Sequence, residues 1–135
     1  MKKRVNIFYI SRLFDPLFSL SDDETDELAS LNPDNELQVK VLLNNFILGN
    51  FNRYGQASQS IVKATLLYLL CYGIENHDFS ELFPYGDVPI NAPKNKKLFF
   101  TWLWEVLFPN EDSQNCADEF IVENNYNAPN SVFIK

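Results

Sequence analysis

Apolar stretches alternate with short polar breaks along the chain, and this pattern predicts a series of helices. The most apolar stretch is residues 58–73, in which nearly every position after Lys63 is hydrophobic until Gly73. A helix that is apolar on all sides is typical of a protein interior, so this segment is expected to form the centre of the core. Its longest apolar run, 64–73, covers about half of a membrane span, which favours a core helix over a membrane anchor.

A clear start signal predicts a helix over 21–31. Ser21 is followed three positions later by Glu24, which is the capping-box pattern. Asp22 and Asp23 join Glu24 in the first turn, where the helix dipole stabilises negative charge. About half of the acidic cluster in this segment therefore has a structural explanation.

The next helix is predicted over 35–48, with either Asp34 or Asn35 as its N-cap. Gly49 follows, and we expect it to end the helix in a left-handed conformation. Residues 50–58 are polar and are expected to form a loop before the central apolar helix.

Residues 98–108, LFFTWLWEVLF, predict a helix that begins near Pro93 or Lys94 and ends at Pro109. Its polar positions recur at three- and four-residue intervals, which gives the helix a narrow solvent-facing stripe. The stripe consists of Lys94, Lys97, Thr101 and Glu105. The core side is expected to consist of Leu98, Phe99, Trp102, Leu103 and Val106. Three residues border the stripe and are expected to reach a partner, Trp104 foremost: Phe100, Trp104 and Leu107.

The N-terminal segment permits two interpretations. Residues 4–14 fit either a short strand or a first helix, and the spacing of their apolar positions favours the helix. A helix is also predicted over 111–124, with its acids on one side. If the N-terminal segment is a strand instead, the SVFI sequence at 131–134 is its expected partner.

Together these elements predict an all-α fold, a single compact bundle of five or six helices with at most a short N-terminal or C-terminal strand. One domain is expected over residues 1–135. The proline-rich stretch 84–96 is the longest predicted loop, but the roughly forty residues after it are too few to fold alone, so it is not expected to be a domain boundary.

The net charge of −7 argues against some classes of partner. A protein that grips phosphate groups needs a surplus of Lys and Arg, so neither nucleic acid nor a membrane is expected as a partner. Residues 14–36 carry eight acids and no base, and residues from 98 onward carry six acids and one base. One explanation is a solvated surface that keeps the protein soluble, and the other is a basic protein partner.

The sequence contains no recognisable catalytic or metal-binding motif. Its one histidine, His77, stands beside Asp78, and Cys116 is the only nucleophile left if Cys71 is a buried thiol, as its apolar surroundings predict. The spacing of these residues does not support a catalytic constellation, and a histidine satisfied within its loop is favoured. We therefore predict that the protein is not an enzyme and has no catalytic, cofactor-binding or metal-binding residues.

We expect a cytoplasmic protein, because the basic N-terminal segment lacks a clean apolar signal core. In its small size, acidic charge, wealth of aromatic residues and lack of catalytic motifs, the chain resembles bacterial immunity proteins of the contact-dependent growth inhibition type. The resemblance implies an antitoxin that binds and neutralises a basic nuclease toxin as a one-to-one heterodimer through an acidic surface. It carries no shared motif.

Two acidic segments, 21–31 and 111–124, are the candidates for this surface. The candidate partner-binding residues are Asp22, Asp23, Asp26, Glu27, Trp104, Glu111, Asp112, Asp118, Glu119 and Glu123. The alternative function is a regulatory or adaptor protein, or a phage-encoded inhibitor, that associates with itself through the helix at 98–108.

Overall fold

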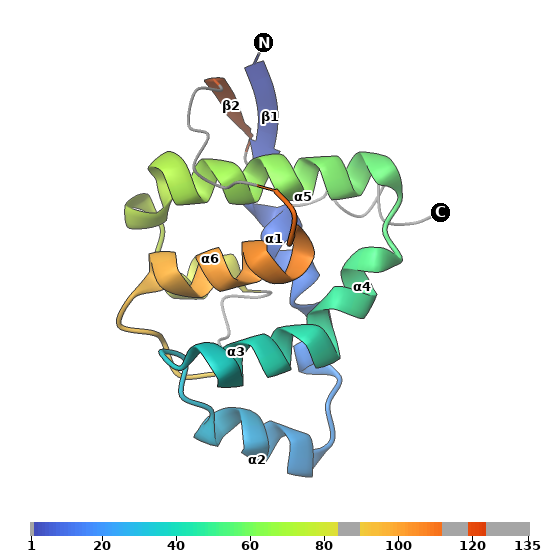
Figure 1. Ribbon diagram of the computed structural model, residues 1–135, viewed down its shortest axis with the longest axis vertical. Coiled ribbons are helices and arrows are strands. Elements are labelled where there is room, and N and C mark those ends of the chain that lie inside the picture. The colour runs from blue at the N-terminus through green and yellow to red at the C-terminus, as the bar shows by residue number, and fades with distance from the viewer. Residues whose placement is uncertain (1, 84–89, 112–118, 124–135) are drawn as a thin grey trace.

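A long helical segment lies across the molecule, between the two strands and the other helices, in the computed structural model, which describes residues 2–83, 90–111 and 119–123 (Figure 1). The segment begins with α5 (Gln56–Tyr68), passes through a π turn, η3 (Leu69–Gly73), and ends with a 3₁₀ turn, η4 (Ile74–Asn76). Between residues 64 and 70 every side chain is buried except that of Tyr68, which is half-buried. The prediction of a central core helix is therefore confirmed.

This segment is also long and apolar enough to cross a bilayer, judged by length and composition alone. Over its most apolar window, however, 56% of it is buried inside the protein. It packs against the N-terminal strand and the first helix, and its side chains join the main cluster of buried residues. The same apolar character is therefore explained by its place in the core.

A two-stranded parallel sheet lies at one end of the molecule, next to α5 (Figure 1). Strand β1 (Lys2–Asn6) pairs with β2 (Glu119–Glu123) in a register that sets Lys2 opposite Glu119 and Val5 opposite Val122. The chain thus brings its basic N-terminal segment beside an acidic segment more than a hundred positions later. Val5 is buried against the body of the protein at 1% exposure.

Two expectations about the chain ends need correction. The N-terminal segment is first a strand and only then a helix, α1 (Ile7–Leu13), which begins after Asn6 because the Asn6 side chain accepts a hydrogen bond from the amide of Phe8. The helix predicted over 111–124 is wrong for Glu119–Glu123, which form β2. The aromatic and β-branched run at 120–122 suits a strand once a partner strand is available.

The remaining helices stack below α5 in the view of Figure 1, in the order α6 (Lys96–Leu107), α3 (Glu36–Leu42) and α2 (Asp22–Ser30). The capping box between Ser21 and Glu24 is present and starts α2, as predicted. Asn35, rather than Asp34, caps α3. The described chain is completed by a π turn, a short helix and two 3₁₀ turns: η2 (Leu43–Ile47), α4 (Leu48–Asn52), η1 (Asp15–Phe18) and η5 (Phe79–Leu82).

Gly49 does not end a helix as expected. It lies inside α4, and its backbone is not in the left-handed region. The helix continues because Phe51 is buried at 4% exposure and its ring packs edge-on against Phe108, with ring centroids 5.4 Å apart. Burial of an aromatic ring outweighs the weak local preference of glycine for a helix end.

Helix α6 lies deeper in the protein than its sequence suggests. Trp104 is 2% exposed, and Phe100 and Leu107 are also buried, so the prediction that these three residues reach a partner is wrong. The indole nitrogen of Trp104 donates to the backbone carbonyl of Glu111 at 2.9 Å, which satisfies its polar group inside the core. Leu98, expected in the core, is 40% exposed.

Strand β1 is joined to α5 by a buried hydrogen bond that can be tested directly. The backbone amide of Asn6 donates to the Thr65 hydroxyl at 3.1 Å, and Thr65 is completely buried. Thr65→Val keeps the shape of the side chain but removes the acceptor. We expect the free energy of unfolding in urea to fall by about 1–3 kcal/mol.

Thr101→Val is the matched control, because the Thr101 hydroxyl bonds only a carbonyl of its own helix, that of Lys97. It should change the free energy of unfolding by roughly 0.5 kcal/mol or less. Equal effects of the two substitutions would show that the hydrogen bond between β1 and α5 contributes nothing specific.

An acidic groove between α2 and α3

Helix α2 carries five acids and no base: Asp22, Asp23, Glu24, Asp26 and Glu27. All of them are exposed to solvent except Glu24, which is half-buried and whose carboxylate accepts from the amide and the hydroxyl of Ser21. Among the described residues, none of the five forms an ion pair. The first three lie in the first turn, where the helix dipole stabilises them, but Asp26 and Glu27 lie beyond it.

Three other acids of the described chain, Glu36, Glu105 and Glu111, are paired with lysines within the fold. Lys40 of α3 binds Glu105 of α6 at 2.7 Å and Glu36 of its own helix at 2.8 Å. These two hydrogen bonds, that to Glu105 first, raise the pKa of Lys40. Lys63 of α5 forms an ion pair with the carboxylate of Glu111. The contrast leaves α2 as a concentration of negative charge with no counterion among the residues that the structure describes.

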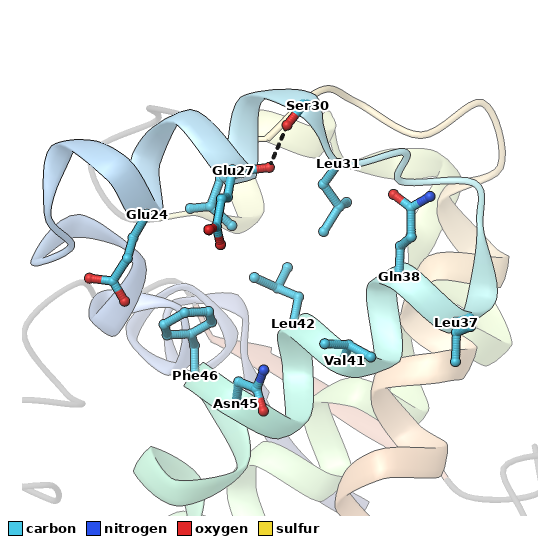
Figure 2. A pocket seen from close by; sticks show the side chains of 11 residues that line it. Glu24, Glu27, Ser30, Leu31, Leu37, Gln38, Val41, Leu42, Asn45 and Phe46 are labelled. Carbon is cyan, nitrogen blue, oxygen red and sulfur yellow. Dashed lines mark hydrogen bonds between the residues drawn. The ribbon is translucent and has the colours of Figure 1, made fainter.

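An apolar groove runs between α2 and the helix formed by α3 and η2 (Figure 2). Its volume is about 460 Å³, which falls within the range of ligand-binding pockets, about 300–1,000 Å³. We call it the α2–α3 groove. It is lined by Glu24, Glu27, Leu28, Ser30 and Leu31 from α2 and the residue after it, and by Leu37, Gln38, Val41, Leu42, Asn45 and Phe46 from the opposite wall.

The α3 wall exposes more apolar surface than a solvated helix normally does. Leu37 is 74% exposed and Val41, one turn later, is 51% exposed. Phe46 is half-buried, and Figure 2 shows its ring at one end of the groove. Contiguous exposed apolar surface with a polar rim is characteristic of a binding site.

A π turn shapes the end of this wall. In η2 the helix widens, and the side-chain amide of Asn44 donates to the carbonyl of Lys40 at 2.8 Å, one turn back. Phe46 and Asn45, which line the groove, both belong to this turn. Such turns are uncommon in helices and often occur at functional sites.

Helix α2 is attached to the body of the protein mainly at its C-terminal end. Leu28 is its one buried residue. The Asn91 amide donates to the carbonyl of Ala29 at 3.2 Å, and the carboxylate of Asp34, just beyond α2, accepts from the amide of Lys94 at 2.9 Å. The groove therefore has one fixed end, while the N-terminal half of α2 contains no buried residue and begins at its own capping box.

The structure separates the residues predicted to bind a partner. Four of them lie on the solvent-exposed surface of α2: Asp22, Asp23, Asp26 and Glu27. Glu111 is exposed but paired with Lys63, and Trp104 lies in the core. Glu119 and Glu123 are placed by the backbone of β2 only, and Asp112 and Asp118 lie outside the described residues.

The groove itself was not predicted from the sequence. Leu37, Val41 and Phe46 belong to the apolar positions of the predicted helix, and their spacing alone does not show which element covers them. The available signal was an excess of apolar positions: residues 37–48 hold more hydrophobic side chains than one buried helix face needs.

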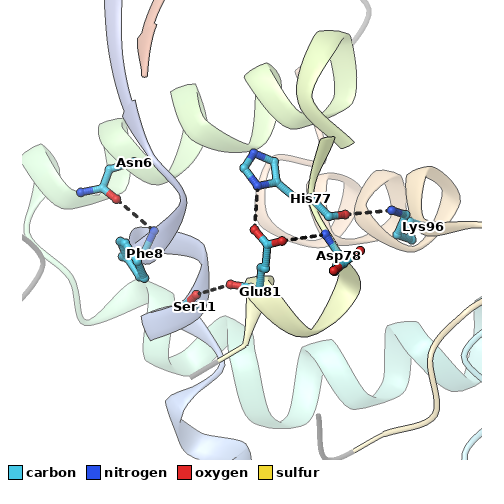
Figure 3. A network of polar contacts seen from close by, with 7 residues as sticks. All are labelled: Asn6, Phe8, Ser11, His77, Asp78, Glu81 and Lys96. Atoms are coloured by element: carbon cyan, nitrogen blue, oxygen red, sulfur yellow. Dashed lines mark hydrogen bonds and ion pairs between the residues drawn. The ribbon is translucent and has the colours of Figure 1, made fainter. Parts of the chain in front are cut away.

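The His77 ring is satisfied locally, as predicted, and its partner is the carboxylate of Glu81 (Figure 3). Its Nδ1 lies 3.2 Å from the Glu81 carboxylate, and the hydrogen bond from His77 lowers the pKa of Glu81. Among the described residues, no hydroxyl or thiol lies within hydrogen-bond distance of the ring. The hydroxyl of Ser11 is directed instead to the Glu81 carbonyl at 3.2 Å.

The other polar groups do not form a metal site in the part of the chain that the structure describes, where no group of three His, Cys, Asp or Glu side chains could hold an ion. Burial raises the pKa of Asp15, but its carboxylate is paired with Arg12 at 3.3 Å. The absence of catalysis stays a prediction.

Cys71 is not the buried thiol that its sequence context predicted. It is half-buried and disulfide-bonded. The other cysteine of the sequence, Cys116, lies outside the described residues. Disulfides persist mainly in oxidising compartments, so this bond argues against the cytoplasmic localisation expected from the sequence, which stays a prediction.

The chain matches no protein-family model, and no curated protein or solved structure matches it either.

The uncompensated charge on α2 predicts an unusual response to neutralisation. Asp22 with Asp26, and Asp23 with Glu27, are like charges one helical turn apart, and each such pair destabilises a helix by about 0.2–0.5 kcal/mol. Asp26→Asn combined with Glu27→Gln should therefore raise the free energy of unfolding by a few tenths of a kcal/mol at low salt. The gain should vanish in about 1 M salt.

Glu36→Gln is the control with the opposite expected sign, because Glu36 is paired with Lys40. Urea denaturation at two ionic strengths measures both variants. A loss of stability in the α2 double variant at low salt would mean that its acids are compensated within the fold.

Proposed function

We propose that the protein is a non-catalytic binding module that holds a basic protein through the acidic α2 surface and the groove beside it. The observation that carries this proposal is the set of exposed carboxylates on α2, Asp22, Asp23, Asp26 and Glu27, which form no ion pair with any described residue and lie next to exposed apolar side chains of α3. Repelling charges and exposed apolar groups are both unfavourable in the isolated protein. A basic partner with apolar residues would relieve both.

The partner class that fits best is a nuclease toxin domain. Proteins that act on nucleic acid carry a surplus of Lys and Arg, which an acidic surface can attract over a distance and cover. With a net charge of −7 and no recognisable catalytic motif, the chain is suited to be a bacterial immunity protein that forms a one-to-one heterodimer with its toxin. Direct binding of nucleic acid or of a membrane remains outside this proposal.

The architecture proposed for this module is a single domain over residues 1–135, with its helices packed as one compact bundle. One continuous cluster of buried side chains supports it, since α1, α3, α5 and α6 all contribute to that cluster. Cytoplasmic localisation belongs to the same proposal, with the Cys71 disulfide as the observation that counts against it.

Self-association through 98–108, the alternative function, has less support. Among the described residues of α6, the large hydrophobic side chain exposed to solvent is that of Leu98. An obligate dimer interface needs a broad apolar surface, and α6 uses its own inside the core.

Neutralisation of a toxin tests the proposed function. In immunity systems the toxin gene lies directly upstream, so the C-terminal domain encoded there would be expressed alone and together with this protein. We expect the toxin domain to stop growth, co-expression to restore it, and the two chains to co-purify one-to-one. Because opposite charges steer the encounter, association should slow as salt rises.

Two double variants that each raise the net charge by two provide the contrast. Asp26→Asn with Glu27→Gln should slow association at low salt by roughly three- to tenfold. Glu36→Gln with Glu105→Gln removes acids that are already paired with Lys40 and should have a smaller effect. Failure of the unaltered protein to restore growth, or equal effects of both variants, would contradict the proposal.

A further inference from the structure

We propose that the α2–α3 groove receives a single amphipathic helix of the partner, with apolar residues on the groove floor and Lys or Arg side chains against α2. This inference rests on the proposed function and specifies the chemistry of the partner at the same site.

The length and composition of the groove floor fit a helix. Leu37 and Val41 stand one turn apart, and the lining continues along the same side to Phe46. Leu37 and Phe46 are nine positions apart, which at 1.5 Å per position is about 14 Å, so the exposed stripe can contact about two and a half turns of a partner helix. Its apolar residues would follow the spacing i, i+3 or i+4, and i+7.

The walls of the groove favour a helix over an extended peptide. Both walls are helical, so their backbone amides and carbonyls are bonded within each helix and present no strand edge. An extended peptide on this apolar floor would leave part of its own backbone without hydrogen-bond partners. A helix satisfies its backbone internally and brings only side chains to the floor.

The two walls differ in charge, which fixes the orientation of the partner's basic residues. Glu24 and Glu27 line the groove on the α2 side, and Asp23 and Asp26 extend the negative charge over the same helix. The opposite wall presents the neutral amides of Gln38 and Asn45 (Figure 2).

The nearest base on α3 is already neutralised within the fold. Lys40 is bound to Glu105 and Glu36 and is not among the residues that line the groove. Basic residues on one flank of the incoming helix are therefore favoured, and an anionic ligand such as a fatty acid is disfavoured.

The attachment of α2 allows the groove to adapt to such a helix. Its C-terminal half is held by the buried Leu28, by the hydrogen bond from the Asn91 side chain to Ala29 and by Asp34, whereas its N-terminal half contains no buried residue. A small rotation of α2 about the fixed end changes the width of the groove without disturbing the core. Regions with few buried contacts move at low energetic cost.

A designed peptide tests the inference without knowledge of the natural partner. The probe is a peptide of about fourteen residues that contains only Leu and Lys in helical amphipathic order. A second peptide has the same composition in an order that breaks the apolar face. Calorimetry at about 150 mM salt should show the amphipathic peptide binding at least about tenfold more tightly than the scrambled one.

Variants of this protein locate the binding site. Leu37→Ser with Val41→Ser should weaken binding of the amphipathic peptide by about tenfold or more, because both side chains lie on the proposed contact surface. Val122→Ser is the matched control: Val122 is 52% exposed, close to the 51% of Val41, and lies in β2 at the opposite end of the molecule (Figure 1). It should leave binding unchanged.

Nuclear magnetic resonance of the unaltered protein locates the peptide-binding site without any substitution. Addition of the amphipathic peptide should shift the amide signals of residues 23–31 and 37–46 most strongly. Shifts centred elsewhere would overturn the inference.

The failures of the two proposals can be told apart. Equal binding of both peptides, or no effect of the Leu37 and Val41 changes, overturns the helix in the groove while the acidic surface can still bind a toxin. A neutral Leu–Gln peptide that binds as tightly as the Leu–Lys peptide overturns the charged orientation. Tight peptide binding together with no rescue of growth overturns the proposed function instead.

Discussion

Burial of the long helical segment Gln56–Asn76 is the constraint on which the rest of the structure depends. Residues 64–70 offer apolar side chains in almost every direction, so neighbouring elements must cover them. Strand β1 and helix α1 pack on α5, and α6 reaches η3. The apolar faces of these elements are therefore buried. Trp104 faces inward for this reason, although the spacing of the polar positions placed it at the border of the solvent-facing stripe.

The α2–α3 groove is formed by residues of α2 and α3 that the core does not bury. Helix α2 has one residue to bury, Leu28, and five acids that repel one another, so it lies at the far end of the molecule with little holding it there. Lysines near the core are matched by Glu36, Glu105 and Glu111. The apolar side of α3 that faces α2 is therefore only partly covered. Charge and apolar surface occur together at this place because the core uses neither Asp26 and Glu27 of α2 nor the exposed Leu37 and Val41 of α3.

Local signals in the sequence were sufficient for some features and not for others. The Ser21–Glu24 capping box and the core helix predicted over 58–73 are decided by neighbours in the chain, and both predictions are confirmed, with the burial of the helix concentrated at 64–70. Strand β2 depends on a partner strand more than a hundred positions away, and its five residues lie in a segment whose spacing also suits a helix. The predicted helix end at Gly49 is wrong because Phe51, two residues later, is buried against Phe108 and keeps the chain helical. The groove depends on the relative placement of two helices, which no local pattern specifies.

Amide hydrogen exchange of the free protein and of its complex with the upstream toxin domain tests the central claim most directly. If the α2–α3 groove and the acidic surface of α2 are the interface, binding should slow amide exchange most in residues 22–46, which contain both walls of the groove. The reason is that the partner would suppress local opening of α2. Exchange in β1 and β2 should change little. Protection concentrated in the strands or in α6, with residues 22–46 unaffected, would contradict the assignment of the interface to the groove.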